Sequence, residues 1–462
     1  MSSDRSTGST SRPIPFPCNL VSSPKYYSNC LRALELALGE VSAYQSWRTL
    51  DPGTEYNIDE RYAAMPAFTK KDIRENFPQG LLPKGRDVRR GLTSGEIDLV
   101  KTSGSTGDAV TNIWNQKWWD ASEKASWSLN SVATNVATGE HREVILANPR
   151  NVGFISDEAE LPMEKRCLSR FLYLNEKTDP LSWTPEHMDR MIRELEVFRP
   201  AVLEANPSLL ARLCRYIVSS GKTVFQPGLI VFTYEYPTKF HYQQILQAFR
   251  VPIASSYGTT EVGYVFMQCE KGKLHQNVQY CRVDFQPLKP EHGGPHVGRI
   301  LVTTFNNPWY ILVRFDVGDL VRLDEEGACP CGRQGGLILS TTEGRSANVT
   351  LTCGGRLVTL RELDNAVSVL EDVEQYRLDQ LSRDEYRLHL VSPRTDRKTL
   401  SGQADRVLEK LYGEEADISV VFETDIAPSS SGKYSISETS FPINLEDFLD
   451  TRYARKATTI AG

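Results

Sequence analysis

The spacing of apolar residues predicts helices at the start of the chain. Between residues 25 and 43, apolar residues recur at helical spacing, which indicates an amphipathic helix. Thr69 precedes Lys70 and Lys71 in the segment 65–83, so we expect it to cap a second, short helix.

Strands alternate with helices through the middle of the chain. Residues 97–114 predict a strand, a loop of small residues and a second strand, and residues 117–134 predict a helix. Strand–turn–helix units follow at residues 142–149, 201–217 and 228–249. This alternation favours an α/β fold of layered sheets and helices with a substantial parallel sheet.

From Val297 onwards, short β-type runs separated by Gly and Pro dominate. They occupy residues 298–305, 309–323 and 336–342, and they predict a β-rich subdomain over about 297–344. Beyond this segment the pattern predicts a compact α+β unit, with helices and strands at residues 360–373, 386–393, 403–412 and 418–424.

We therefore expect a large N-terminal domain over residues 25–344, a small mobile C-terminal lid over residues 345–462 and a disordered tail over residues 1–24. A length of 462 residues suits two or three domains. A composition of 40% hydrophobic and 24% charged residues is typical of a soluble globular protein.

Charge and hydropathy exclude several classes of protein. The formal net charge of −6 leaves no broad basic field, which argues against nucleic acid as a partner. No apolar run approaches the roughly 20 residues that span a bilayer, and the polar N-terminus lacks the apolar segment of a secretory signal. We expect a cytoplasmic protein without a membrane partner, in which the nine cysteines form no disulfide framework.

The first motif with chemical potential is a loop of small residues. Small residues allow tight turns whose amides point at phosphate oxygens, and three hydroxyls add donors. No Gly-Lys-Ser/Thr ends the loop, so it is not a Walker A motif, and a plain serine-rich turn is the alternative. The loop consists of Thr102, Ser103, Gly104, Ser105, Thr106 and Gly107.

The second motif follows the apolar run 251–255. Tyr257 offers a flat face for a base, Thr260 a hydroxyl for a phosphate, and Glu261 a hard oxygen ligand for Mg²⁺. Ligands of α/β proteins bind where strands end in this way, although an ordinary polar turn is the alternative. Ser256, Gly258 and Thr259 complete the motif.

Three further motifs lie later in the chain. Asp319, at the end of Arg314–Asp319, suits bidentate bonding to ribose hydroxyls, or caps a β-turn. Arg345, in the segment 344–348, lies where the composition changes and where Gly and Ser suit a hinge. Lys433 ends a Ser-Gly loop and can stabilise charge that develops at a reacting centre, or simply be a solvated loop lysine.

The order and kind of these motifs resemble the adenylate-forming superfamily, which activates carboxylic acids as acyl-adenylates. Within it, the chain is most similar to the phenylacetate–coenzyme A ligase-like branch. The segments 65–80, 205–208 and 329–333 share this resemblance, which extends from Tyr26 to Tyr434.

The resemblance implies a role for each motif. The loop after Thr102 would hold the β- and γ-phosphates of ATP, and Thr260 would contact the α-phosphate while Glu261 binds Mg²⁺. Lys433 would bridge the substrate carboxylate and the α-phosphate, and the lid would rotate near Arg345 between two half-reactions. The remaining nucleotide contacts implied are Tyr257 for adenine, Asp319 for ribose, and Gly258, Thr259 and Glu235 nearby.

The sequence departs from the family pattern at three places. Asp108 and Ala109 follow the loop, where relatives have Lys and Pro. Asn348 or Ala347 stands where relatives have an acidic hinge residue. Tyr234 precedes Glu235 where relatives have a small residue, so we expect an altered acyl or adenine pocket.

Three cysteines and one histidine suggest a metal centre. Cys269 and His275, together with Cys329 and Cys331, would supply the tetrahedral sulfur and nitrogen ligands of a closed structural Zn²⁺ site. The ligase-like branch has a similar set. Four unrelated residues are the alternative, and Cys281 is the rival fourth ligand.

The function expected from the resemblance is AMP-forming acyl-CoA synthesis from ATP, an aryl or arylacetic acid and coenzyme A. A carrier protein or an amine is the alternative acceptor, and a zinc-stabilised scaffold without catalysis is the alternative of another class. A homodimer is common among relatives. Candidate aryl-pocket residues, which packing would explain equally well, are Trp114, Trp118, Trp119, Trp127 and Tyr234.

Overall fold

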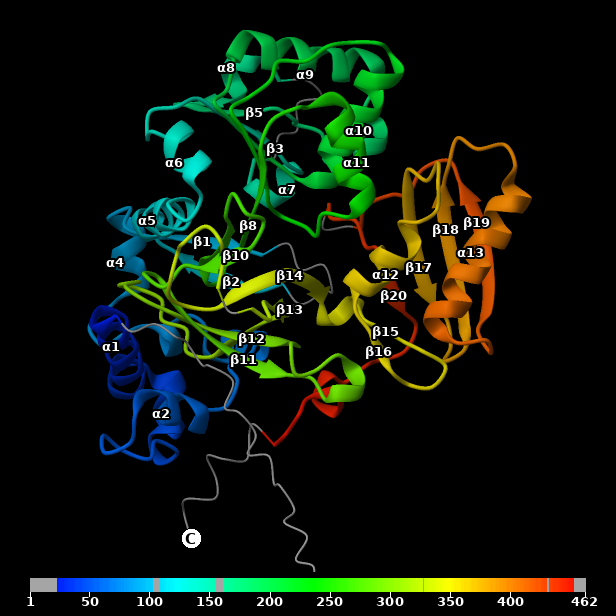
Figure 1. Ribbon diagram of the computed structural model, residues 1–462. Helices are drawn as coiled ribbons and strands as arrows, with labels where there is room; N and C mark the ends of the chain where they lie inside the picture. Colours follow the sequence, from blue (N-terminus) through cyan, green and yellow to red (C-terminus); the bar gives the residue numbers. More distant parts are fainter. Residues whose placement is uncertain (1–22, 103–108, 155–160, 327, 430–431, 453–462) are drawn as a thin grey trace, which may run out of the picture.

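A twelve-stranded sheet forms the centre of the computed structural model, which describes residues 23–102, 109–154, 161–326, 328–429 and 432–452 (Figure 1). The strands lie in the order β11-β12-β13-β14-β10-β9-β8-β7-β6-β3-β5-β4. Helices pack against this sheet, so the expected mixed α/β fold class is confirmed. The expected tail lies almost entirely outside the described residues.

One half of the sheet is parallel, as the alternating pattern predicts. Its five parallel strands are β3 (Glu143–Leu146), β5 (Phe171–Tyr173), β6 (Val202–Ala205), β7 (Leu229–Phe232) and β8 (Ile253–Thr259), and β4 (Cys167–Leu168) pairs antiparallel at the edge. Asparagine or threonine side chains cap the helices between these strands. Each side chain accepts a hydrogen bond from a backbone amide in the first helical turn, which has no partner within the helix. These helices are α9 (Pro185–Phe198), α10 (Pro207–Ser219) and α11 (Lys239–Ala248), and together they bury one face of the strands.

The opposite face of the parallel strands is only partly covered. Trp127 of α5 (Gln116–Trp127) and Ala133 of α6 (Ser131–Val136) pack with Val202, Val231 and Ala254 of the sheet. The short helices nearby are α7 (Pro149–Val152) and α8 (Met163–Arg166). The part of this face that these contacts leave open becomes a wall of the cavity described below.

The other half of the sheet is antiparallel. It continues from β8 through β9 (Gly263–Gln268), β10 (Leu274–Gln276), β14 (Ile338–Arg345), β13 (Phe315–Leu323), β12 (Val297–Thr304) and β11 (Cys281–Pro287). The strand predicted over 309–323 is wrong in its first part. The Asn307 side chain accepts hydrogen bonds from the amides of Trp309 and Tyr310, and Arg314 has a φ of 51°, so the strand begins only at Phe315.

N-terminal helices pack on this antiparallel half. Cys30 and Leu34 of the first of them are completely buried in a core shared with strands β11 to β14. Thr69 forms the expected cap, since its side chain accepts from the Asp72 amide while the Asp72 carboxylate accepts from the Thr69 amide. The helices are α1 (Pro24–Glu40), α2 (Ile58–Ala64), α3 (Lys70–Asn76) and α4 (Val88–Thr93).

The last hundred residues form a second, smaller α/β unit, drawn from yellow to red in Figure 1. Its four strands lie in the order β19 (Asp417–Glu423), β18 (Glu385–Val391), β17 (Gln375–Gln380) and β20 (Ser437–Thr439). Helices α12 (Leu360–Val367) and α13 (Arg397–Tyr412) pack on them, and the small ribbon β15 (Thr350–Leu351) with β16 (Leu357–Val358) precedes them. Phe240 of α11 enters the core of this unit and contacts Tyr376, so the two units meet along α11.

None of the helices in the described ranges is both long and apolar enough to span a lipid bilayer.

Candidate active site

A cavity of about 3140 Å³ lies where the parallel half of the sheet, the antiparallel half and the C-terminal unit meet. Its walls include the carboxyl ends of β6, β7 and β8, which is where ligands of α/β proteins bind. Eight of the residues predicted as site residues line it, from segments far apart in the chain: Glu235, Tyr257, Gly258, Thr259, Thr260, Glu261, Asp319 and Arg345. Thr102 and Lys433 line it as well.

Tyr257, Asp319 and Arg345 form one connected group. The Tyr257 hydroxyl donates a hydrogen bond of 2.7 Å to Oδ2 of Asp319, and Nε of Arg345 lies 3.6 Å from Oδ1 of the same carboxylate. The sheet register imposes this arrangement, because Asp319 of β13 pairs directly with Arg345 of β14. Burial, and then the Asp319 charge, raise the pKa of the Tyr257 hydroxyl well above its ordinary value, so it remains a donor.

Gly258 allows the chain to pass close to the neighbouring strand. A Cβ atom there would lie 2.4 Å from the carbonyl oxygen of Gly263 in β9, which no side chain tolerates. The glycine therefore fixes where Thr259, Thr260 and Glu261 enter the cavity.

Glu261 is buried beside a lysine that the sequence motifs do not include. Its Oε1 atom lies 3.7 Å from Nζ of Lys70, and only 4% of Glu261 is exposed. Lys70 follows Thr69, so the capping of α3 places it at the cavity. A carboxylate oxygen at this position suits a hard divalent cation such as Mg²⁺.

The loop of Lys433 inserts into the cavity against α7. Gly432 has a φ of 79°, and a Cβ atom on it would lie 2.4 Å from Cγ of the buried Asn148. The Ser429 amide donates to the Lys433 carbonyl at 2.8 Å, and the Tyr434 amide donates to Glu235 at 3.4 Å. The loop therefore closes tightly against the N-terminal part of the chain.

The Lys433 ammonium loses its proton more readily than an ordinary lysine. Burial, and then the neighbouring Arg345 guanidinium, lower the pKa of its ammonium to about 8, and Glu235, Asp319 and Glu261 partly oppose this shift. A lysine close to three carboxylates and an arginine is placed to balance charge at a reacting centre.

The predicted phosphate loop is described only at its ends. Ser103, Gly104, Ser105, Thr106 and Gly107 lie outside the described residues, as does Asp108. The strands on either side are present as predicted: β1 (Asp98–Lys101) and β2 (Thr111–Trp114) form an antiparallel ribbon. The Thr102 amide donates to the Val110 carbonyl at 2.9 Å, which brings the loop ends together at the cavity.

Asn348, at the expected hinge, holds the C-terminal unit. Its Nδ2 donates to the Ser437 carbonyl at 2.7 Å, and the Ser437 hydroxyl donates to the Asn348 carbonyl at 2.5 Å. The residue that departs from the family pattern thus binds the backbone of β20, four residues beyond Lys433.

The four candidate metal ligands converge, and one of them, Cys269, also lines the cavity. The ligand atoms of Cys269, His275, Cys329 and Cys331 all lie within 4.8 Å of one another, and three of the residues are buried. Sγ of Cys331 lies 3.3 Å from Nε2 of His275, and the two other thiols lie 3.7 Å apart. The set has the soft ligands and the spacing of a four-coordinate Zn²⁺ site.

The rival ligand Cys281 is outside this cluster. Its Sγ atom points instead to the Asn277 carbonyl at 3.4 Å.

Four of the five candidate aryl-pocket residues line the cavity: Trp114, Trp119, Trp127 and Tyr234. Trp118 is a packing residue, because its Nε1 donates to the Phe305 carbonyl at 2.7 Å in the core. Trp119 packs against Trp114 and Tyr264, with ring centroids 4.1 and 4.9 Å apart. The cavity thus has one aromatic wall.

Known proteins share this architecture at low sequence identity. No family model matches the chain. Protein CapK of Staphylococcus aureus is 23% identical over 380 residues, which cover 80% of this chain and 78% of that protein. 2-Hydroxyisobutyryl-CoA ligase, solved in its postadenylation state with 2-HIB-AMP, superposes with a TM-score of 0.66 and 14% identity, covering 90% of this chain and 89% of that chain. The chain has the fold of adenylate-forming enzymes.

The same ligase in its thioesterification state, with 2-HIB-AMP and CoA, superposes with a TM-score of 0.51, at 15% identity and the same coverage. Within the adenylate-forming fold, the cavity of this chain contains residues that motif reasoning missed. They are Lys70, Glu123 and Glu204. Glu204 alone left a signal in the sequence, since it interrupts the otherwise apolar strand β6.

Proposed function

We propose that the protein activates a carboxylic acid with ATP, forming an acyl-adenylate and pyrophosphate, and then transfers the acyl group to coenzyme A. The observation that carries this proposal is the convergence of Lys433 with Asp319, Glu261 and Arg345 in one cavity of an adenylate-forming fold. These residues come from four separate motifs and from two units of the structure.

In the first half-reaction, a carboxylate oxygen of the acid attacks the α-phosphorus of ATP, and the bond to pyrophosphate breaks. The Lys433 ammonium would offset the negative charge that builds on the phosphoryl and carboxylate oxygens. Asp319, oriented by Tyr257, would accept hydrogen bonds from the ribose, and Glu261 would hold a Mg²⁺ ion that shields the phosphate charges.

In the second half-reaction, a thiolate attacks the acyl carbonyl and AMP leaves. Lys433 lines the cavity, so the C-terminal unit would rotate about residues 345–348 and withdraw the lysine before the thiol enters. Coenzyme A is the acceptor favoured here, since a CoA ligase superposes over 90% of this chain with a TM-score of 0.66.

We further propose that Cys269, His275, Cys329 and Cys331 bind a structural Zn²⁺ ion. The ion would join the loop after β9 to the loop between β13 and β14 and leave no position open for substrate.

The proposed function is tested by carboxylate-dependent exchange of pyrophosphate into ATP, over a panel of aryl, arylacetic and aliphatic acids. Exchange with at least one acid, together with thioester and AMP once coenzyme A is added, is the expected result. Lys433→Ala should lower the exchange rate by about 100-fold or more while ATP binding persists. Exchange without thioester would move the acceptor to a carrier protein or an amine, and a wild-type protein that neither binds ATP nor supports exchange would refute the proposal.

A further inference from the structure

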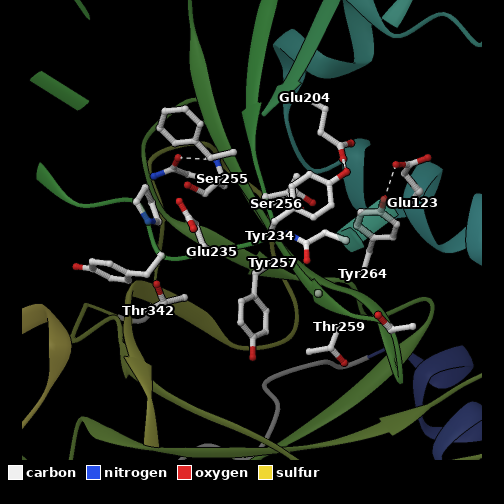
Figure 2. A pocket seen from close by; sticks show the side chains of 18 of the residues that line it. Glu123, Glu204, Tyr234, Glu235, Ser255, Ser256, Tyr257, Thr259, Tyr264 and Thr342 are labelled. Atoms are coloured by element: carbon white, nitrogen blue, oxygen red, sulfur yellow. Dashed lines mark hydrogen bonds between the residues drawn. The ribbon is translucent and has the colours of Figure 1, made fainter. Parts of the chain in front are cut away.

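Two tyrosine–carboxylate pairs line the cavity. The Tyr264 hydroxyl donates to Glu123 at 2.6 Å, and the Tyr234 hydroxyl donates to Glu204 (Figure 2). Glu204 is buried, whereas Glu123 and the two tyrosines are half-buried. Neither carboxylate belongs to an adenylation motif, and removing a carboxylate from water is costly unless a partner compensates it.

The fold brings these residues to one wall. Glu204 lies on β6 beside Ile145 and Val231 in the register, so it shares the sheet face with Ser256 of β8. Glu123 faces it from α5, where residues 119, 123 and 127 recur at helical spacing on the cavity side. Figure 2 shows both pairs together on this side of the pocket.

Tyr234 adopts an unusual backbone conformation to reach Glu204. Its φ is 74°, a left-handed value that bulky residues rarely take. Such strain persists only where the surrounding structure enforces it, and it is most frequent at functional sites. Here it aims the ring into the cavity, beside the carboxylate.

The wall brings three carboxyl groups together. Glu143, the third of them, lies 3.2 Å from both Arg170 and His141, so it already pairs with the nearby arginine. Within the described ranges, no lysine or arginine lies within ion-pair distance of Glu123 or Glu204. Burial, and then the Glu143 charge, raise the pKa of Glu123 to about 7 and that of Glu204 well above its ordinary value.

The Ser256 hydroxyl is a further hydrogen-bond acceptor on the same wall. Ser256 is only 8% exposed and lines the cavity, and its Oγ has no hydrogen-bond partner among the described residues. Buried polar groups normally have hydrogen-bond partners, so the unpartnered Ser256 hydroxyl indicates a position where a ligand binds. The charged neighbours of Lys433 are Arg345, Glu235, Asp319 and Glu261, so the wall of Glu123 and Glu204 lies towards the other end of a bound acid.

We propose that this wall selects a carboxylic acid that carries an amino group, bound as its ammonium by Glu204, Glu123 and Ser256, with a flat body against Trp119 and Tyr264. This inference rests on the proposed adenylation function. An ammonium donates three hydrogen bonds and stabilises the ionised forms of the two carboxyl groups, whereas an unsubstituted aryl acid offers them neither a donor nor a counterion. Glu204 is thus a specificity-determining residue.

The test compares three acids of similar size: 4-(aminomethyl)benzoate, 4-(hydroxymethyl)benzoate and 4-ethylbenzoate, with ω-amino and unsubstituted aliphatic acids beside them. In pyrophosphate exchange, kcat/KM for the acids that carry an amino group should exceed that for their neutral counterparts by roughly 100-fold. Glu204→Gln should remove most of this preference, because it raises KM for the amino-substituted acids far more than KM for 4-ethylbenzoate. Glu196→Gln, an exposed carboxylate on α9, is the matched control and should change nothing.

Three results would overturn the inference while the adenylation function stands. The first is equal use of 4-ethylbenzoate by the wild type. The second is a preference for 4-(hydroxymethyl)benzoate, which would mean that protonated carboxyls donate to a hydroxyl. The third is a Glu204→Gln variant that loses activity equally with every acid, which indicates a structural role. Failure of every acid in the wild type would instead refute the adenylation function and this inference with it.

Discussion

The Tyr257 hydroxyl holds Oδ2 of Asp319 at 2.7 Å, while Arg345 approaches the other oxygen of the same carboxylate. The carboxylate is therefore fixed from two sides before any ligand binds. Preorganisation of this kind reduces the entropy lost on binding, so each of the two contacts should contribute to nucleotide affinity.

Tyr257→Phe removes one of these contacts and preserves the ring. We expect KM for ATP to rise about tenfold with a smaller change in kcat, because the lost bond orients a charged acceptor. Initial rates of exchange at varied ATP check this. Tyr216→Phe is the matched control, since it also removes a 2.7 Å tyrosine–aspartate bond, to Asp189, but outside the cavity. An equal effect of both variants would contradict the role of Tyr257.

The pH dependence of adenylation should follow Lys433. Its pKa is lowered to about 8, so the ammonium is charged below this pH and becomes neutral above it. We expect kcat/KM for ATP to fall as pH rises through about 8 in the free enzyme. In Lys433→Arg the guanidinium stays charged throughout, so the remaining activity should not show this fall. The same alkaline fall in both proteins would assign it to another group.

Gly432 should separate the two half-reactions. In Gly432→Ala, the new Cβ would meet Asn148 at 2.4 Å, and the φ of 79° adds backbone strain, so the Lys433 loop should no longer close. We expect adenylation to fall by at least about 30-fold, while thioester formation from supplied acyl-adenylate keeps its rate. Gly85→Ala is the control, because it has a φ of 81° and open space for a Cβ atom. Equal loss of both half-reactions would contradict the assignment.

The proposed metal centre should contribute to the thermal stability of the protein. Purified without chelator, the protein should contain about one zinc per chain, as the closed four-ligand set requires. Cys329→Ser should lose the metal and lower Tm by roughly 5–10 °C. Cys167→Ser, a thiol outside the cluster, should keep both. Metal analysis and thermal unfolding measure this, and a wild type without zinc would exclude the site.

Local patterns predicted most elements of the fold. Thr69 caps a helix where the sequence indicates, since capping depends only on neighbouring residues. The strand over 309–323 was extended too far, because apolar residues such as Tyr310 and Val313 are buried in a loop rather than a strand. Periodicity alone does not distinguish the two.

Sequence motifs predicted part of the cavity lining, and the residues outside these motifs could not be predicted. Tyr257, Asp319 and Lys433 belong to motifs whose order is informative, and all three line one cavity. Glu123 and Glu204 belong to none, and their proximity arises from strand order and from the packing of α5 on the sheet. Three-dimensional neighbourhood of this kind has no local signature.

Strand β8 belongs to both halves of the sheet: one edge pairs in parallel with β7 and the other antiparallel with β9. Ser256, which we propose faces the acid, and Tyr257, which we propose faces the nucleotide, are consecutive residues of this strand. A ligand that fixes one therefore restrains the other, and such coupling is reciprocal. The acid and ATP should consequently affect each other's affinity. An acid that fits the wall of Glu204 better should tighten the binding of ATP. The enzyme should therefore discriminate more strongly between acids when the ATP concentration is low.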